Sequence, residues 1–373
     1  MLEKPDLQDE KISACLQAQY ELVVDQLAFL PLGADLNTAV YRAVSDQGAA
    51  YFVTLRRGPF DEIAVALPRL LSNLGIAQII APLPTRTGQL WADVEIYKLI
   101  LYPFIEGGNG YQVELTDRLW VEFGRALKSI HTAAIPPALR RAIPQESYAP
   151  QWRTSVQKYM ERIERDVFED PVAIELAAVL GAQRETVLDL VRRADRLAAA
   201  LQAQPPEFIV CHSDLHAGNL LITTDNGISN PNVIASRFGE AISSSLPGAK
   251  NETRFYIVDW DSPILAPKER DLMFAGGGQF GSRRTPQEEE ELFYRGYGPT
   301  RINATAMAYY RYERIIQDLA VECEQIASTN GAGEDRQQAL LYLKSNFQPN
   351  GVIEIAFQSD RTRCIITSSS HRK

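Results

Sequence analysis

The sequence predicts an α+β protein of two lobes, a small antiparallel β-rich lobe followed by a larger helical lobe. Three observations lead to this prediction. Short β-rich runs and turn residues fill most of the N-terminal third, apolar residues recur at helical spacing afterwards, and a turn-rich segment, PFIEGGNG at 103–110, separates the two patterns. The chain has 373 residues, and single hydrophobic cores usually stop growing at about 250–300 residues. We therefore expect lobes at 1–104 and 105–373.

Five β-rich runs predict the strands of the small lobe. They lie at 26–30, 39–44, 51–55, 89–92 and 95–103. Turn residues such as Pro31-Leu32-Gly33 separate the runs, which favours antiparallel hairpins. Two helices are expected beside them, at 7–20 and at 61–74. The second opens with acidic residues, which stabilise the positive end of the helix dipole.

Helical periodicity dominates the rest of the chain. The predicted helices lie at 116–133, 149–166, 171–181 and 184–204, with further helices from 269 to the end. Between them, apolar runs at 208–211 and 220–223 flank the segment HSDLHAGN, and a third run at 255–258 leads into DWD. The segment 224–254 is rich in Asn, Ser and Gly and predicts a loop insertion.

Composition excludes several classes of partner. The net charge of −9 argues against nucleic acid, whose phosphate backbone needs clustered Lys and Arg. The four cysteines are scattered and no pair has metal-ligand spacing, so a zinc site is not expected. The sequence has no apolar run long enough for a membrane span and no apolar signal core near its start. We expect a cytoplasmic protein that acts on a small molecule.

The segment from His212 to Asn219 fits the pattern H-x-D-x-x-x-x-N, which indicates phosphoryl transfer. Asp214 is placed to accept the proton of an attacking hydroxyl, and Asn219 to help hold a metal ion. Asp259 follows an apolar run and suits a second metal ligand, and Asp261 lies on the same side if the chain stays extended. Such oxygen ligands favour Mg²⁺. The alternative is a polar turn between two buried strands.

The other residues of this loop receive weaker assignments. We expect His212 to order the loop through hydrogen bonds and Cys211 to be a small core residue. His216 is left without a role.

The stretches VCHSDLHAGNLLI and YIVDWDSPILAPKERDLMF resemble the aminoglycoside phosphotransferases, and within them the spectinomycin phosphotransferases. The segments GADLNTAVY, LILYPFIEGGNG and YYRYERIIQDLAV share the likeness, which extends from the N-terminal helix to about residue 357. The resemblance implies a two-lobed protein-kinase-like fold and transfer of the ATP γ-phosphate to a hydroxyl of a small molecule, in keeping with an antibiotic-resistance enzyme.

The resemblance also implies roles for individual residues. Residues 1–104 would form the nucleotide-binding lobe, and 105–373 the catalytic and substrate-binding lobe. Asp214 would be the catalytic base, and Asn219 and Asp259 would bind Mg²⁺. The ATP adenine would meet the backbone near three residues, Tyr102, Phe104 and Ile105, and the loop that begins at Gly33 would cradle a phosphate.

One position departs from the pattern of such kinases, which carry a Lys on the third strand of the small lobe. In YFVTLRR that position holds Thr54, which supplies no charge. Arg56 projects from the same strand face two residues on, and we hypothesise that it replaces the Lys. Arg42 on the neighbouring strand is a second candidate, and the alternative for Arg56 is a solvated surface charge.

A cationic aminocyclitol would need carboxylates and aromatic faces, and four residues are candidates. They are Asp261, Asp271, Tyr309 and Glu313. Asp271 is also expected, with Arg270, to anchor the loop of the motif through hydrogen bonds, which is a structural role. Two other functions stay open: a kinase of the same fold acting on a metabolite hydroxyl, and a nucleotide-binding protein with little turnover. Thr54 favours the latter, whereas the intact Asp214, Asn219 and Asp259 favour an enzyme.

Overall fold

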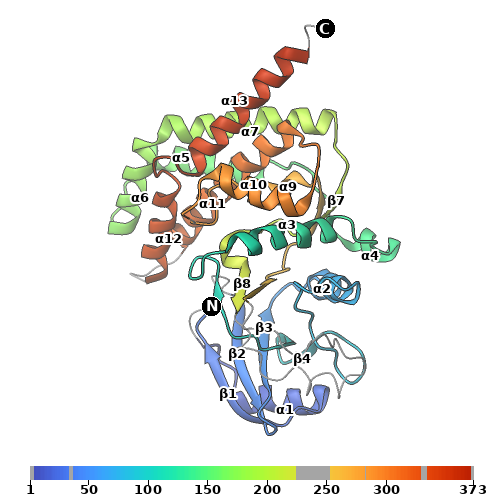
Figure 1. Ribbon diagram of the computed structural model, residues 1–373. Coiled ribbons are helices and arrows are strands. Elements are labelled where there is room, and N and C mark those ends of the chain that lie inside the picture. The colour runs from blue at the N-terminus through green and yellow to red at the C-terminus, as the bar shows by residue number, and fades with distance from the viewer. Residues whose placement is uncertain (1–3, 33–36, 224–252, 282, 329–333, 371–373) are drawn as a thin grey trace. The chain divides into compact units, whose positions relative to one another are not determined.

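The computed structural model (Figure 1) describes residues 4–32, 37–223, 253–281, 283–328 and 334–370. The chain divides into two compact units. Unit 1 consists of Met1–Ile143 and Asp214–Pro263, and unit 2 of Pro144–Ser213 and Ile264–Lys373. The α+β class and the antiparallel β-rich lobe are confirmed. The segment 103–110 falls inside unit 1, and the functional boundary between 104 and 105 stays a prediction.

A five-stranded antiparallel sheet forms the centre of unit 1, with the strand order β1-β2-β3-β5-β4. Its strands are β1 (Val24–Leu30), β2 (Thr38–Ser45), β3 (Ala50–Arg57), β4 (Ala92–Val94) and β5 (Tyr97–Pro103). All five predicted β-rich runs therefore contribute a strand, although β4 is shifted along the chain from 89–92.

Strand β3 shows why the sheet has one buried and one partly open face. Along Ala50–Arg57 the residues Tyr51, Val53 and Leu55 are buried, whereas Thr54 and Arg56 alternate with them and are partly exposed. The buried face forms a core with α1 (Asp9–Tyr20), which packs beside β1 and β4. Full burial of each large aliphatic side chain stabilises such a core by about 1.5–3 kcal/mol. The partly open face is left for polar groups.

A second, three-stranded sheet of unit 1 carries the predicted catalytic loop. Its order is β6-β8-β9, and both pairings are antiparallel. The remaining elements of unit 1 are α2 (Ile63–Asn73), α3 (Asp117–His131), α4 (Pro137–Ala142), β6 (Gly108–Asn109), the 3₁₀ turn η1 (Ala217–Asn219), β8 (Leu220–Thr223) and β9 (Arg254–Ile257). Thr116 caps α3 because its hydroxyl accepts a hydrogen bond from the Leu119 amide at 3.3 Å.

Unit 2 is helical and is organised around one long central helix, α11, which contacts α5, α7, α12 and α13 (Figure 1). Its helices are α5 (Gln151–Arg165), α6 (Pro171–Ala182), α7 (Arg184–Ala203), α9 (Glu269–Leu272), α10 (Pro286–Tyr297), α11 (Ala304–Ser328), α12 (Glu334–Ser345) and α13 (Val352–Ser370). A short two-stranded sheet pairs β7 (Ile209–Cys211) with β10 (Ile264–Ala266). The predicted insertion at 224–254 lies almost wholly outside the described residues.

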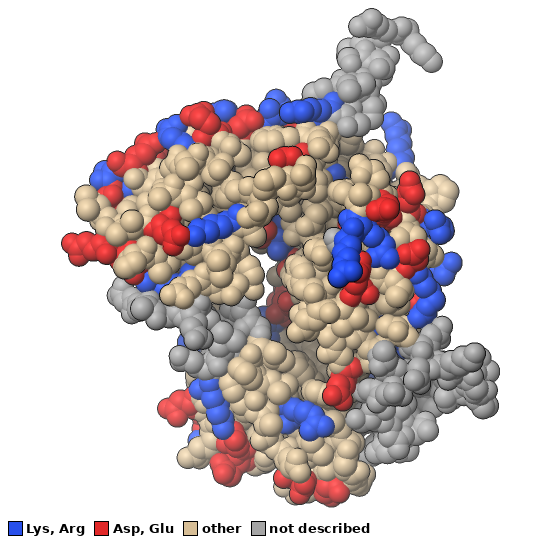
Figure 2. Space-filling view, turned by 60° about the vertical axis from the view of Figure 1, so that its left-hand side comes forward, with Lys and Arg blue, Asp and Glu red and all other residues tan. Residues whose placement is uncertain are grey.

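The surface mixes charges of both signs. On the face shown in Figure 2, Lys and Arg side chains lie beside Asp and Glu side chains over much of the described surface. Among the described helices, none is long and apolar enough to cross a bilayer.

Glu322 on α11 carries a carboxyl group that is unfavourably placed in unit 2. Burial, and after it the charge of Asp318, raises its pKa from 4.5 to about 9, against the smaller opposing effect of Arg314. Its Oε2 is buried and makes no hydrogen bond to any described residue. The folded protein therefore binds a proton that the unfolded chain releases, and stability is lost as the pH rises from about 4.5 to about 9.

We expect Glu322→Gln to raise the free energy of unfolding at pH 8 by about 1–3 kcal/mol, because the Glu322 carboxyl must take up a proton on folding at that pH and Gln need not. Urea denaturation at pH 5 and pH 8 measures this, and the gain should be much smaller at pH 5, which is close to the pKa of 4.5 of the carboxyl in the unfolded chain. A control at the exposed Glu324 should show no such dependence on pH. Equal effects of Glu322→Gln at both pH values would contradict the assignment.

Candidate active site

The loop between β7 and β8 brings two of the predicted site residues together. The side-chain amide of Asn219 donates to the backbone carbonyl of Asp214 at 2.8 Å, and the Asn219 backbone amide donates to the His216 carbonyl at 3.0 Å. The amide nitrogen of Asn219 makes this bond. The bond fixes the plane of the amide and does not use Oδ1, which can therefore serve as a metal ligand. Asn219 is buried and Asp214 is partly exposed, which suits a fixed ligand and an accessible base.

Asp259 reaches the same loop through a turn. Strand β9 ends at Ile257, and the amide of Val258 donates to the backbone carbonyl of Asn219 at 3.0 Å. Asp259 then has a φ of 65°, in the left-handed region that non-glycine residues seldom adopt. The expected extension through Asp259 is therefore wrong. The carboxyl groups of Asp259 and Asp261 nevertheless form a hydrogen bond.

The three carboxyl groups of the site crowd one another. Loss of solvent, the negative charges of Asp261 and Asp214, and the hydrogen bond to Asp261 raise the pKa of Asp259 to about 7, while Arg56 opposes them. Since Asp259 is an exposed residue, we give the neighbouring charges more weight than burial. Carboxylates that repel one another in this way, together with an amide oxygen, are the donor set of a hard divalent cation.

Arg56 points into this cluster of carboxyl groups. Its Nη1 lies 2.7 Å from Oδ1 of Asp261, and the side chains of Arg56 and Asp261 are 19% and 44% exposed. Burial raises the pKa of Tyr102, and the charges of Asp261, Arg56 and Asp259 all act on the same phenol. Thr54 lies on the same face of β3 as Arg56, as expected. Asp261 was predicted to bind the substrate, and the ion pair shows that its carboxylate also has a partner within the protein.

The segment predicted to meet an adenine ring is partly engaged by the protein itself. The backbone amide of Phe104 donates to the Ala50 carbonyl at 3.2 Å. The guanidinium of Arg42 lies over the Phe104 ring, 5.1 Å from its centre. Among the three residues predicted to meet the adenine, Phe104 therefore has a backbone amide that is already used in a hydrogen bond to Ala50. Gly33 and the predicted phosphate loop lie outside the described residues.

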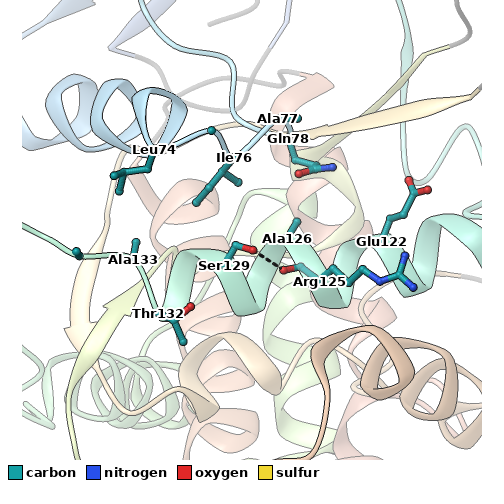
Figure 3. A pocket seen from close by; sticks show the side chains of 12 residues that line it. Leu74, Ile76, Ala77, Gln78, Glu122, Arg125, Ala126, Ser129, Thr132 and Ala133 are labelled. Atoms are coloured by element: carbon teal, nitrogen blue, oxygen red, sulfur yellow. Dashed lines mark hydrogen bonds between the residues drawn. The ribbon is translucent and has the colours of Figure 1, made fainter. Parts of the chain in front are cut away.

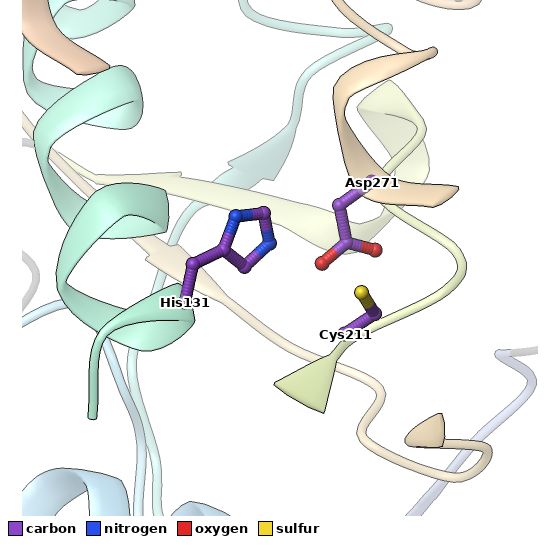
Figure 4. A group of neighbouring side chains, drawn as sticks. All are labelled: His131, Cys211 and Asp271. Atoms are coloured by element: carbon purple, nitrogen blue, oxygen red, sulfur yellow. The ribbon is translucent and has the colours of Figure 1, made fainter. Parts of the chain in front are cut away.

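In unit 2, Asp271 fixes the first two residues of the loop between β7 and β8. Its carboxylate accepts hydrogen bonds from the backbone amides of His212 at 2.9 Å and Ser213 at 2.7 Å. Ser213 has a φ of 77°, so these bonds hold a strained backbone. Figure 4 shows Asp271 beside Cys211, whose thiol has a pKa raised well above 9.0 by burial and by the Asp271 charge. Cys211 is therefore an inert thiol of the interior.

The remaining predicted substrate residues are also in the interior of unit 2. Tyr309 is 1% exposed, and Glu313 is 4% exposed. Arg153 donates to the Glu313 carboxylate at 2.6 Å and to the Tyr309 hydroxyl at 3.2 Å. Together with the buried Asp271, whose contacts match the anchoring role expected for it, these residues all have partners within the protein, and their substrate roles stay predictions.

A group of residues that sequence reasoning left unassigned lies beside Asp214. The Nε2 of His216 is 3.6 Å from Oδ2 of Asp214, and the ring of Tyr111 stacks on the His216 ring with centroids 6.0 Å apart. The motif itself contains His216, but Tyr111 is remote from it in sequence. No spacing signal in the sequence links the two residues.

A cavity of about 430 Å³ opens elsewhere in unit 1, between α3 and the segment 74–78 (Figure 3). Its lining includes Gln78, Glu122, Arg125 and Ser129. None of the predicted site residues is among the lining residues, so this cavity is separate from the carboxylate cluster.

Comparison with known proteins gives a consistent result. The model of a family described as the phosphotransferase enzyme family matches residues 28–229. The structure of spectinomycin phosphotransferase APH(9)-Ia with ADP and spectinomycin is 33% identical, with 95% of this chain and 99% of that chain covered and a TM-score of 0.82. Its AMP-bound complex is 32% identical, covers 93% and 98% of the two chains, and has a TM-score of 0.77.

A more distant structure shares the fold alone. The aminoglycoside phosphotransferase from Alicyclobacillus acidocaldarius is 12% identical, with 96% of this chain and 98% of that chain covered and a TM-score of 0.57. A search of curated proteins found no match.

Proposed function

The chain belongs to the phosphotransferase enzyme family, and on that premise we propose that it transfers the γ-phosphate of ATP to a hydroxyl of a small cationic aminocyclitol such as spectinomycin. The observation that supports this most directly is the meeting of Asp214, Asn219 and Asp259 at one loop of unit 1. The likeness to spectinomycin phosphotransferase over 95% of the chain supports the substrate class.

In the proposed reaction, Asp214 accepts the proton of the substrate hydroxyl as the oxygen attacks phosphorus. Asn219 and Asp259 would hold Mg²⁺, which neutralises phosphate charge when bound. Tyr102, Phe104 and Ile105 would line the adenine site. Since the Phe104 amide is bonded to Ala50, the adenine contact is assigned to the other backbone groups of this segment.

We assign the missing strand cation to Arg56. Its pair with Asp261 joins two partly exposed side chains, and such pairs contribute only about 0–1 kcal/mol. The phosphates of a nucleotide carry more charge than one carboxylate, so they can draw Arg56 away from Asp261 at little cost. We therefore assign Asp261 as the partner of Arg56 and no longer as a substrate ligand.

Arg56→Ala is expected to lower kcat about tenfold to a hundredfold, because a charge-assisted hydrogen bond is worth about 1.5–3 kcal/mol. Steady-state ATP turnover with spectinomycin measures the change. Arg57→Ala is a matched control, since Arg57 is exposed at the end of the same strand, and it should retain wild-type kcat. Unchanged turnover and ATP affinity in Arg56→Ala would rule out the assignment.

The position of Thr54 favours one competing function, a protein that binds nucleotide with little turnover. On that alternative, Thr54→Lys should raise the rate by restoring the cation of related kinases. No gain in Thr54→Lys, together with the loss in Arg56→Ala, would leave Arg56 as the working cation.

The proposed function is tested by ATP consumption with Mg²⁺ in the presence of spectinomycin, other aminoglycosides and metabolite alcohols. We expect spectinomycin-dependent turnover, with the phosphorylated product identified by mass spectrometry. Turnover with a metabolite alcohol alone would indicate a metabolite kinase instead. If none of these acceptors supports turnover, although a thermal-shift assay shows that the protein binds nucleotide, both enzyme functions would be contradicted.

A further inference from the structure

His216 faces Asp214 with one ring nitrogen and its own loop with the other. The Nε2 atom lies 3.6 Å from Oδ2 of Asp214. The Nδ1 atom accepts a hydrogen bond from the backbone amide of Gly218 at 3.0 Å, and the Tyr111 hydroxyl lies 3.3 Å from the same Nδ1. The proposed reaction as described above gives this imidazole no part.

The contact with Gly218 determines where the imidazole carries its proton. A backbone amide can only donate, so Nδ1 must be the acceptor, and a neutral ring then holds its proton on Nε2. That N–H group is the one that faces the carboxylate of Asp214. The distance of 3.6 Å is longer than a hydrogen bond, but contacts of catalytic groups in free enzymes are often long and shorten when substrate binds.

The ring of His216 is held by two neighbours. It stacks on Tyr111, with an interplanar angle of 23°. A Cβ atom at Gly218 would lie 2.6 Å from Cε1 of His216 and 3.3 Å from Cε2 of Tyr111, so only glycine leaves room for the two rings. The backbone that carries Tyr111 is joined to the loop because the Gly110 amide donates to the Ala217 carbonyl at 2.8 Å.

We propose that His216 is a positioning residue for the base Asp214. Its neutral imidazole donates from Nε2 to the Asp214 carboxylate and holds this carboxylate in the orientation in which it accepts the proton of the substrate hydroxyl. A neutral donor orients the carboxylate without placing a positive charge beside it. Tyr111 and Gly218 keep the imidazole in this tautomer and orientation. The proposal rests on the proposed function, in which Asp214 is the base.

The kinetic test compares two substitutions of His216. His216→Leu removes the donor and should lower kcat about tenfold to a hundredfold, the usual effect of losing a group that orients a functional residue, with little change in the KM for ATP. His216→Gln keeps an N–H donor near the same place and should recover most of that loss. Wild-type kcat in His216→Leu, or a His216→Gln enzyme as slow as His216→Leu, would overturn the proposal.

Tyr111 provides a second kinetic test with a matched control. Tyr111→Leu should lower kcat in the same direction as His216→Leu but by less, because it removes a support of the ring and leaves the donor. Tyr342 is exposed to nearly the same degree, 57% against 58% for Tyr111, and Tyr342→Leu should leave kcat unchanged. Equal effects of the two tyrosine substitutions would contradict the role of Tyr111.

A spectroscopic test does not depend on turnover. The chain has four histidines, and ¹⁵N spectra of their imidazoles at about pH 8, where free imidazole is neutral, report each tautomer. We expect the protonated nitrogen of His216 to be Nε2, and Asp214→Asn to move its signals. A proton on Nδ1, or signals insensitive to Asp214→Asn, would overturn the proposal, whereas wild-type protein without turnover would instead contradict the proposed function.

Discussion

Asp214→Asn is expected to lower kcat by about 10²–10⁴-fold, the range by which a positioned general base accelerates proton transfer. The amide cannot accept a proton at neutral pH, yet it has nearly the same shape as the carboxylate. The backbone carbonyl of Asp214, which Asn219 contacts at 2.8 Å, is untouched by the substitution. Loss of activity should therefore not come with loss of structure. Single-turnover kinetics with ATP and spectinomycin measure the chemical step directly.

Nucleotide binding is the control for this variant. Because Asp214 is assigned no contact with ATP, its thermal shift with ATP and Mg²⁺ should stay close to that of the wild type. Full activity of Asp214→Asn would contradict the mechanism, whichever substrate is used. Loss of nucleotide binding in the same variant would instead place Asp214 among the metal ligands.

Asp271→Ala is expected to have the largest effect on the catalytic loop as a whole. It leaves the amides of His212 and Ser213 without their carboxylate acceptor. At about 1.5–3 kcal/mol for each hydrogen bond to a charged group, the cost is about 3–6 kcal/mol. The positive φ of Ser213, 77°, would then lose the bonds that maintain it. Chemical denaturation should show the loss of stability. The fall in kcat should exceed the fall that the fraction of unfolded protein in the assay would cause.

Glu269 offers a matched comparison on the same short helix. It is also buried, and its carboxylate accepts a hydrogen bond from the backbone amide of Asn303 at 2.8 Å. Glu269→Gln should cost stability and leave the kcat of the folded protein unchanged, because its contacts lie away from the residues that precede Asp214 in the chain. If Asp271→Ala also kept wild-type kcat in its folded fraction, Asp271 would be a residue of stability alone.

Most of the fold was predictable because its elements have strong local signals. The alternation along β3 and the helical spacing along α7 are periodic over seven residues or more, and both elements lie where the pattern indicates. The elements that escaped prediction are short. Strand β6 has two residues and β10 has three, and pieces of that length carry no periodic pattern.

The candidate site was predictable where its residues are close in sequence. The pairing of Asp214 with Asn219 follows from one loop, and the place of Asp259 follows from the strand before it. The sequence does not reveal that Asp259 turns with a positive φ, because the neighbouring Val258 is bonded to Asn219, which is distant in the sequence. It also does not reveal that Arg56 meets Asp261, since the two are 205 positions apart.

The substrate residues are the hardest part of the site to predict from the sequence, for a physical reason. Tyr309 and Glu313 have the chemistry that would bind a cationic aminocyclitol, but the same chemistry satisfies a buried Arg153. Sequence alone does not distinguish a polar group that faces a ligand from one that faces a buried cation, because both positions need the same side chain.

The pairing of β6 with β8 has a consequence for how the protein acquires activity during synthesis. Gly108 pairs with Ile222 and Asn109 with Leu221, whereas β1, β2 and β3 pair as consecutive hairpins. Bringing two distant segments together lowers the entropy of the chain before their contacts contribute favourable free energy, so such pairings form slowly. The five-stranded sheet can form on the nascent chain while the catalytic loop is still being translated. A polypeptide released early would then hold a folded sheet and no catalytic centre.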